Sequence, residues 1–207
     1  FGQAHKRGMP LIAGKALMDR HAPDGLRDDV DRAQRDCEAL IARWHGRDRL
    51  AYAVTPRFAA TSTHAQLAMA GRLLARHAGL YMQTHVAESR AEVAWISALF
   101  PEARSYLDVY AQAGLLGERS VLAHGIWLDD ADRRQLAECG AQIAHSPSSN
   151  LFLGSGLMDW AALDVAGVKV SMASDVGGGT SLSMTRTLAD AYRVQALVEA
   201  RLCVSEL

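Results

Sequence analysis

The chain has 207 residues, of which 49% are hydrophobic and 22% are charged, enough apolar residues for a substantial core. Its 22 basic and 23 acidic residues leave a formal net charge of -1, which argues against a nucleic-acid-binding or membrane-surface protein. No run approaches the ~20 apolar residues that span a bilayer. The three separated cysteines, Cys37, Cys139 and Cys203, indicate reduced thiols in a cytosolic protein rather than a disulfide scaffold.

Short apolar runs bounded by glycine or polar clusters predict strands that are buried on both faces, as in a parallel sheet. Six such runs lie at 11–18, 50–55, 80–86, 120–126, 141–144 and 168–173.

Helical spacing of apolar residues, together with capping and stop residues, predicts amphipathic helices between the strands. They are expected at 30–44, from the cap candidates at 61–63 to Gly79, at 89–100, at about 130–138 and at 184–198. Ser89 and Glu92 form a capping-box pattern at the start of the third.

Strands that alternate with helices, without hairpin signals, predict βα units in a single domain over 1–207. A doubly wound sheet and a (β/α)8 barrel both fit this α/β pattern. No G-x-G-x-x-G follows an early strand, which favours the barrel.

Polar side chains follow the predicted strands, and in both architectures the chemistry lies at the carboxyl ends of strands. They are Arg57 and Phe58, His85 and Glu88, His124, His145, and Asp175. Because three histidines and one aspartate end four separate apolar runs, we expect a convergent site.

Imidazole and carboxylate groups are suitable ligands for Zn²⁺ or Fe²⁺. A bound metal lowers the pKa of its water to about 7. Glu88, three residues after His85, is then placed to carry a proton, and Arg57 offers a planar fork for a carbonyl group of a substrate. Together these roles describe metal-assisted hydrolysis.

Each of these residues also has a structural interpretation. An imidazole can be a hydrogen-bonded core group, and Asp175 can form an ordinary turn. Glu88 can favour a helix N-terminus, and Arg57 can belong to an ion pair. His145 either lines the site or packs a loop.

Five motifs occur in a fixed order along the chain: 55–58 (TPRF), 82–89 (MQTHVAES), 123–125 (AHG), 144–150 (AHSPSSN) and 174–181 (SDVGGGTS). With them, essentially the whole chain resembles the guanine deaminases of the metal-dependent amidohydrolase superfamily. The pattern His…His-Gly…Asp marks the superfamily, and Pro-Arg-Phe with Asp-Val-Gly-Gly-Gly narrows it to these deaminases.

The resemblance implies a (β/α)8 TIM barrel of the amidohydrolase type that holds one zinc ion, or iron, and hydrolyses guanine to xanthine and ammonia. It implies a small purine as substrate, no nucleic-acid or membrane partner, and a homodimer. Arg57 matches a residue that reads the carbonyl edge of the purine, and Phe58 packs against the ring.

The remaining site roles also come from this resemblance. His85 and Asp175 match metal ligands. Glu88 matches a proton shuttle, and His124 matches the histidine that orients the attacking water. Asp175 would also take a proton from that water and pass it towards the leaving amine.

Two departures from the family pattern affect this prediction. The H-x-H pair that supplies two further zinc ligands is absent from the chain, and the six strands leave about six of the eight βα units. We therefore expect a fragment that lacks the first two units and the segment beyond Leu207, binds zinc weakly and shows little or no deamination alone. Two alternatives stay open: an amidohydrolase for another aminated heterocycle, such as 8-oxoguanine or a triazine, or an inert barrel piece that acts as a binding or scaffold protein.

Overall fold

The computed structural model describes residues 1–204, and its centre is a seven-stranded sheet in which every paired strand is parallel to its neighbour. Along the sheet the order is β1, β3, β4, β5, β6, β7, and β2 also pairs with β3. The strands are β1 (Leu11–Ala13), β2 (Ala16–Leu17), β3 (Leu50–Pro56), β4 (Tyr81–Val86), β5 (Ser120–His124), β6 (Gln142–His145) and β7 (Lys169–Met172).

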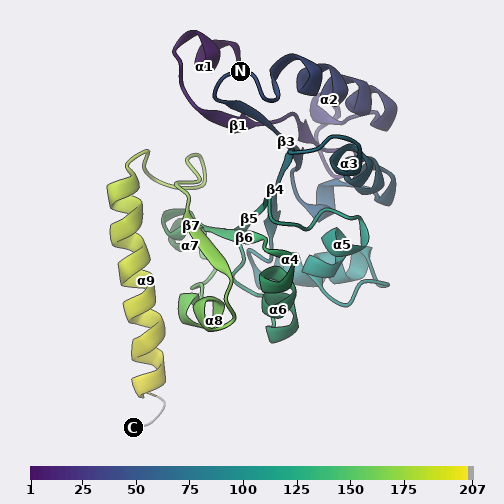
Figure 1. Cartoon of the computed structure of the whole chain (residues 1–207). Coiled ribbons are helices and arrows are strands. Elements are labelled where there is room, and N and C mark those ends of the chain that lie inside the picture. The colour runs from purple at the N-terminus through teal and green to yellow at the C-terminus, as the bar shows by residue number, and fades with distance from the viewer. Residues whose placement is uncertain (205–207) are drawn as a thin grey trace.

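The strand order decides between the two predicted architectures. A doubly wound sheet reverses its order at a switch point, whereas here each strand is added on the same side of the previous one, as in a barrel. Figure 1 shows the strands crossing the molecule from β1 to β7, with α2, α3 and α5 along one side and α6 and α8 below. The sheet is curled into part of a barrel, which confirms the predicted partial TIM barrel.

The predicted strand 11–18 is wrong in one respect, because it is two strands on the same partner. Leu11 pairs with Leu50 and Ala16 with Thr55, so the register is kept across the gap. At Gly14 a Cβ atom would lie 1.7 Å from the carbonyl oxygen of Ala53. The backbone therefore approaches its neighbour too closely for regular pairing, and only glycine fits there.

The helices that were predicted from periodicity are present. They are α2 (Val30–Trp44), α3 (His64–Arg76), α4 (Arg90–Leu99), α6 (Asp130–Cys139) and α9 (Met184–Val204). The side chains of Asp29, Thr63, Ser89 and Asp129 accept hydrogen bonds from backbone N–H groups of their first turns, which satisfies donors that lack a partner within the helix. The structure adds short segments without a readable period: α1 (Gly2–Lys6), η1 (Asp24–Leu26), η2 (Ala59–Thr61), α5 (Tyr106–Gln112), α7 (Pro147–Leu153) and α8 (Trp160–Val165).

Within the described residues, none of these helices is both long and apolar enough to cross a bilayer.

Candidate active site

A cavity of about 290 Å³ opens at the carboxyl ends of the strands. It is lined by Arg57, Phe58, His85, Glu88, Glu92, His124, Leu153, Asp175 and Gly178. Six residues that the sequence proposes for a site are among them, whereas His145, the third histidine of the strand-end pattern, is not.

The six predicted residues come from four different strand ends, because Phe58 shares one with Arg57 and Glu88 shares one with His85. Arg57 follows β3, His85 lies near the end of β4, His124 is the last residue of β5, and Asp175 comes three residues after β7. Because parallel neighbouring strands end at one edge of the sheet, residues up to 118 positions apart in sequence share one cavity.

The hydroxyl of Tyr110, on α5, fixes two of these strand ends to each other. It accepts hydrogen bonds from the backbone N–H of Ala59 (2.9 Å) and from Oγ1 of Thr84 (3.1 Å), and it donates to the carbonyl oxygen of His85 (2.7 Å). Burial raises the pKa of Tyr110, so the hydroxyl keeps the proton that it donates. The segment after β3 and the end of β4 are therefore held at a constant separation.

Three residues near these strand ends adopt the left-handed backbone conformation without being glycine. They are Ala87 (φ 47°), His124 (φ 71°) and Asp175 (φ 46°). This conformation costs a residue with a side chain roughly 1–2 kcal/mol. Strain of this kind persists where the surrounding structure holds it, and it is enriched at active sites.

The two histidine rings of the cavity face each other, with centroids 5.4 Å apart and planes 28° from parallel. Nδ1 of His85 lies 2.7 Å from the carbonyl oxygen of Arg57, and Nδ1 of His124 lies 2.8 Å from Oδ1 of Asn150. Because these oxygens only accept, each Nδ1 donates, and in the neutral ring each Nε2 keeps its lone pair. Burial lowers the pKa of His85, which favours that neutral form.

Glu88 lies beside His124. Its Oε2 is 3.5 Å from Nε2 of His124, and its Oε1 accepts a hydrogen bond of 2.9 Å from Oγ of Ser155. His124 is 1% exposed and Glu88 21% exposed. The carboxylate is thus in contact with the cavity while one of its oxygens is held from behind.

The loop after β7 approaches the cavity closely at Gly178. A Cβ atom at this position would lie 2.8 Å from Oγ of Ser149 and 3.0 Å from Oδ2 of Asp175. A larger residue would therefore displace the Asp175 carboxylate. The glycine run that follows Asp175 in the sequence has this steric function in the structure.

Arg57 and Phe58 form the outer wall. Arg57 is exposed, and its guanidinium carbon lies 5.1 Å from the centre of the Phe58 ring. Phe58 also meets Trp95 edge-on, with centroids 6.1 Å apart. A flat aromatic surface and a planar cation therefore stand together at the cavity.

Glu92 lines the cavity, although the sequence analysis assigned it only to a capping box. Ser89 does cap its backbone N–H, but the Glu92 carboxylate does not return a bond to Ser89 among the hydrogen bonds of residues 1–204. Its Oε1 is buried and has no hydrogen-bond partner among those residues. Burial raises the pKa of this carboxyl group. Its position four residues after Glu88, in the first turn of α4, is the sequence signal that was available.

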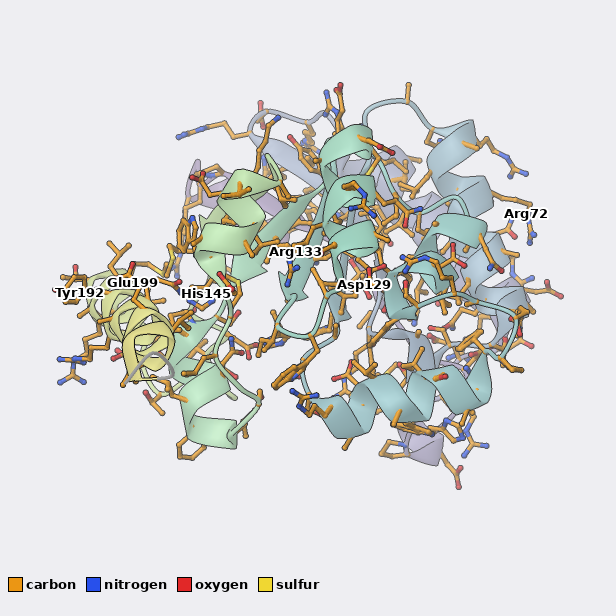
Figure 2. The ribbon with its side chains drawn as sticks, turned by 90° about the horizontal axis from the view of Figure 1, so that it is seen from below. Arg72, Asp129, Arg133, His145, Tyr192 and Glu199 are labelled. Atoms are coloured by element: carbon orange, nitrogen blue, oxygen red, sulfur yellow. The ribbon has the colours of Figure 1, made fainter. Side chains whose placement is uncertain are left out.

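His145, the last residue of β6, packs against Trp160 of α8 and does not line the cavity. It is fully buried, meets Trp160 edge-on at 6.0 Å, and has no hydrogen-bond partner on either nitrogen within 1–204. Burial lowers its pKa to about 4. Figure 2, seen from below, places it on the α9 side of the molecule, away from Asp129 and Arg133 on the α6 side.

The donor atoms of the cavity fit part of a metal site. A neutral imidazole whose Nδ1–H is held by a carbonyl oxygen is a common arrangement for a metal-bound histidine, and His85 has it. Asp175 supplies a carboxylate to the same cavity. However, no three His, Cys, Asp or Glu side chains within residues 1–204 lie close enough together to hold a metal ion. The chain therefore offers an incomplete set of ligands.

Comparison with known proteins supports the interpretation of this cavity as a candidate active site. Guanine deaminase of Escherichia coli is 43% identical over 206 residues, which cover 100% of this chain and 47% of that protein. Its solved structure superimposes with a TM-score of 0.95 over 96% of this chain and 47% of that chain. Guanine deaminase from C. acetobutylicum, solved with guanine bound in its active site, gives a TM-score of 0.93 at 26% identity and covers 97% of this chain and 48% of that one.

The chain thus spans about half the length of the curated relatives that it matches. The family model of the amidohydrolases matches residues 2–205, in agreement with the parallel half-barrel and with the His and Asp groups at its strand ends. The chain belongs to the amidohydrolase family.

Proposed function

We propose that this chain carries most of the active site of a guanine deaminase, which hydrolyses guanine to xanthine and ammonia. The observation that carries the proposal is the convergence of Arg57, His85, Glu88, His124 and Asp175 on one cavity. The identity of 43% to the Escherichia coli enzyme across the chain supports guanine as the substrate.

Arg57 and Phe58 bind the purine. The planar guanidinium donates hydrogen bonds to the carbonyl edge of the base, and the Phe58 ring packs against its face. Both residues follow β3, the strand next to β4, and they line the same cavity as the acid and base groups. This arrangement directs the amine-bearing carbon of the base towards Glu88.

Glu88, His124 and Asp175 handle the protons. Glu88 helps to deprotonate the attacking water and delivers a proton to the ring nitrogen, which quenches the anion that forms as the C–O bond is made. His124, 3.5 Å from Glu88, orients the water. Asp175 takes a proton from the attacking water and passes it to the amine as the C–N bond breaks and ammonia leaves.

His85 and Asp175 would hold a divalent metal, for which zinc is the expected ion and iron the alternative. Such an ion lowers the pKa of a bound water to about 7 and so makes hydroxide available at neutral pH. The ligand set is completed by groups outside residues 1–204, in keeping with the missing H-x-H pair.

The alternatives have less support. Triazine hydrolase and atrazine chlorohydrolase structures match at about 20% identity, which shows the fold alone. No observation favours an inert scaffold. A single domain over 1–207, a homodimer and a cytosolic location stay predictions.

Metal content and ammonia release test the proposal. The chain is joined to the part of the Escherichia coli guanine deaminase that lies outside the matched region, and the chimera is compared with the chain alone. The chimera is expected to bind about one metal ion and to release ammonia from guanine faster than from 8-oxoguanine or an aminated triazine. The variants His85→Ala and Asp175→Ala are expected to lose metal and activity together.

A folded chimera without metal and without ammonia release would contradict the proposal. A chimera that prefers another amine would show that guanine is not the substrate. It would leave the assignment of a hydrolytic site unchanged.

A further inference from the structure

A short segment behind the cavity contacts both His124 and Glu88. It consists of residues 150–155, from α7 to the turn after it, and we call it the brace. Asn150 provides the first contact, because its Oδ1 accepts the 2.8 Å hydrogen bond from Nδ1 of His124. Both side chains are 1% exposed, so water does not compete for this bond.

Asn150 has no evident structural use for the rest of its side chain. Its Nδ2 is buried and has no hydrogen-bond partner within residues 1–204. Burying an amide with unpaired donors is unfavourable for stability. The one side-chain bond that Asn150 makes there is the bond to Nδ1 of His124.

Ser155 provides the second contact. Its Oγ donates a 2.9 Å hydrogen bond to Oε1 of Glu88, and the serine is 7% exposed. This bond leaves Oε2 as the oxygen that faces Nε2 of His124. The brace therefore orients the carboxylate as well as the imidazole.

The two contacts are fixed relative to each other by the backbone of the brace. The N–H of Ser155 donates to the carbonyl oxygen of Asn150 (2.9 Å), and Nε1–H of Trp127 donates to the carbonyl oxygen of Ser155 (3.0 Å). At Gly156 a Cβ atom would lie 2.7 Å from the Trp127 ring, so the turn is pressed against that ring. Trp127 itself follows His124 by three residues, so the contacts of the brace return to the segment that carries His124.

We propose that Asn150 and Ser155 are positioning residues: Asn150 holds His124 in the Nδ1–H tautomer, and Ser155 holds the Glu88 carboxylate in place beside His124. Only the catalytic role of these two contacts rests on the proposed function; the contacts and the tautomer do not depend on it. In the Nδ1–H tautomer, Nε2 offers a lone pair to the cavity, as orientation of a water by His124 requires. The opposite tautomer would present a proton there instead.

The tautomer can be measured directly in the 207-residue chain, without metal or substrate. Long-range ¹H–¹⁵N correlation spectra of the histidine rings, recorded at about pH 9, report which nitrogen of His124 carries the proton. The wild-type chain is expected to show Nδ1–H. Asn150→Asp keeps an acceptor oxygen and is expected to keep this tautomer, whereas Asn150→Leu removes the acceptor and is expected to move the proton to Nε2.

Ser148→Ala is the matched control, because it removes a hydrogen bond from the same helix to Asp190 on α9 and leaves both brace contacts in place. It is expected to leave the His124 spectrum unchanged. Ser155→Ala is expected to move the ¹³Cδ signal of Glu88 at constant pH while His124 keeps Nδ1–H.

A wild-type His124 with its proton on Nε2, or an Asn150→Leu chain that keeps Nδ1–H, would overturn the role of Asn150. An unmoved Glu88 signal in Ser155→Ala would overturn that of Ser155. Neither readout involves deamination. A chimera that folds but fails to deaminate guanine would therefore contradict the proposed function without contradicting the role of the brace.

Discussion

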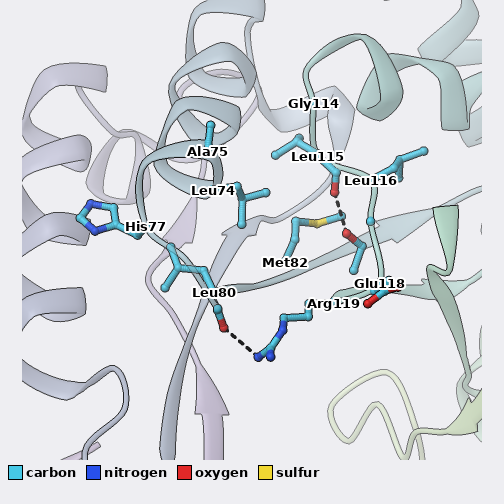
Figure 3. A pocket seen from close by; sticks show the side chains of 13 residues that line it. Leu74, Ala75, His77, Leu80, Met82, Gly114, Leu115, Leu116, Glu118 and Arg119 are labelled. Atoms are coloured by element: carbon cyan, nitrogen blue, oxygen red, sulfur yellow. Dashed lines mark hydrogen bonds between the residues drawn. The ribbon is translucent and has the colours of Figure 1, made fainter.

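The two ends of the parallel sheet each have a cavity, and the larger one is at the end without the site. At the amino ends of β4 and β5, a cavity of about 450 Å³ is lined by thirteen residues, among them four leucines and Met82. Figure 3 shows Arg119 donating a hydrogen bond to the backbone there, at 3.0 Å from the carbonyl oxygen of Gly79. Ser120 likewise donates to the carbonyl oxygen of Leu115. Polar groups at this end tie loops together, whereas those at the carboxyl end face a shared cavity.

The backbone shows the same contrast. In the loops before β3, β4, β5, β6 and β7, glycine takes the left-handed conformation at 46, 79, 114, 140 and 167, and Asp48 takes it as well before β3. At the carboxyl end, Ala87, His124 and Asp175 take that conformation in spite of their side chains, in addition to Gly125 and Gly177. In these loops, left-handed residues with a side chain are thus more numerous at the carboxyl end. Cavity volume alone would have selected the wrong end.

The largest effect is expected from replacing a glutamate by glutamine at one end of the sheet and comparing it with the same replacement at the other end. Glu88→Gln in the active chimera should lower kcat by on the order of 10²-fold or more, because the amide cannot carry the proton. Glu118→Gln, in the amino-end cavity, should leave kcat unchanged. Steady-state kinetics of the two variants checks this. Equal losses of kcat in the two variants would contradict the placement of the catalytic groups at the carboxyl end alone.

We expect acid to lower the free energy of unfolding through His145, which lies at the carboxyl end of β6. Its pKa is lowered from the ordinary 6.5 to about 4 by burial, so between these values the unfolded chain binds the proton and the folded chain does not. The free energy of unfolding should therefore fall as the pH falls from about 6.5 to about 4, by about 3 kcal/mol from this group.

His145→Phe, which keeps a ring against Trp160, should flatten this part of the profile in urea unfolding measured at several pH values. A variant with the same acid dependence as the wild-type chain would show that His145 does not contribute.

The smallest effect separates the two kinds of left-handed residue. At Gly114 a Cβ atom meets nothing within 4 Å, so Gly114→Ala should cost only the conformational penalty, about 1–2 kcal/mol. Ala87→Gly relieves that penalty, but it loses a buried methyl group and adds unfolded-state entropy, and these contributions roughly cancel. Urea unfolding should show a loss for the first variant and almost no change for the second. A large loss for Ala87→Gly would mean that this position is not strained.

Sequence reasoning found the site because its signal is local. Each of the six predicted residues lies near the end of an apolar run or shortly after it, and parallel strands bring such positions to one edge. Glu92 was missed because its capping-box spacing already explained it. Asn150 and Ser155 were missed because their partners lie 26 and 67 residues away. In addition, α7, which carries Asn150 and ends two residues before Ser155, is too short to have a readable period. The interruption at Gly14 depends on the carbonyl group of Ala53 on another strand, which no local pattern reveals.

The most direct test of the account is a crystal structure of the chimera with guanine bound. The purine is expected in the carboxyl-end cavity, with its carbonyl edge at Arg57, its face on Phe58 and its amine-bearing carbon towards Glu88. Guanine in the amino-end cavity, or in the carboxyl-end cavity with its amine turned away from Glu88, His124 and Asp175, would contradict the account.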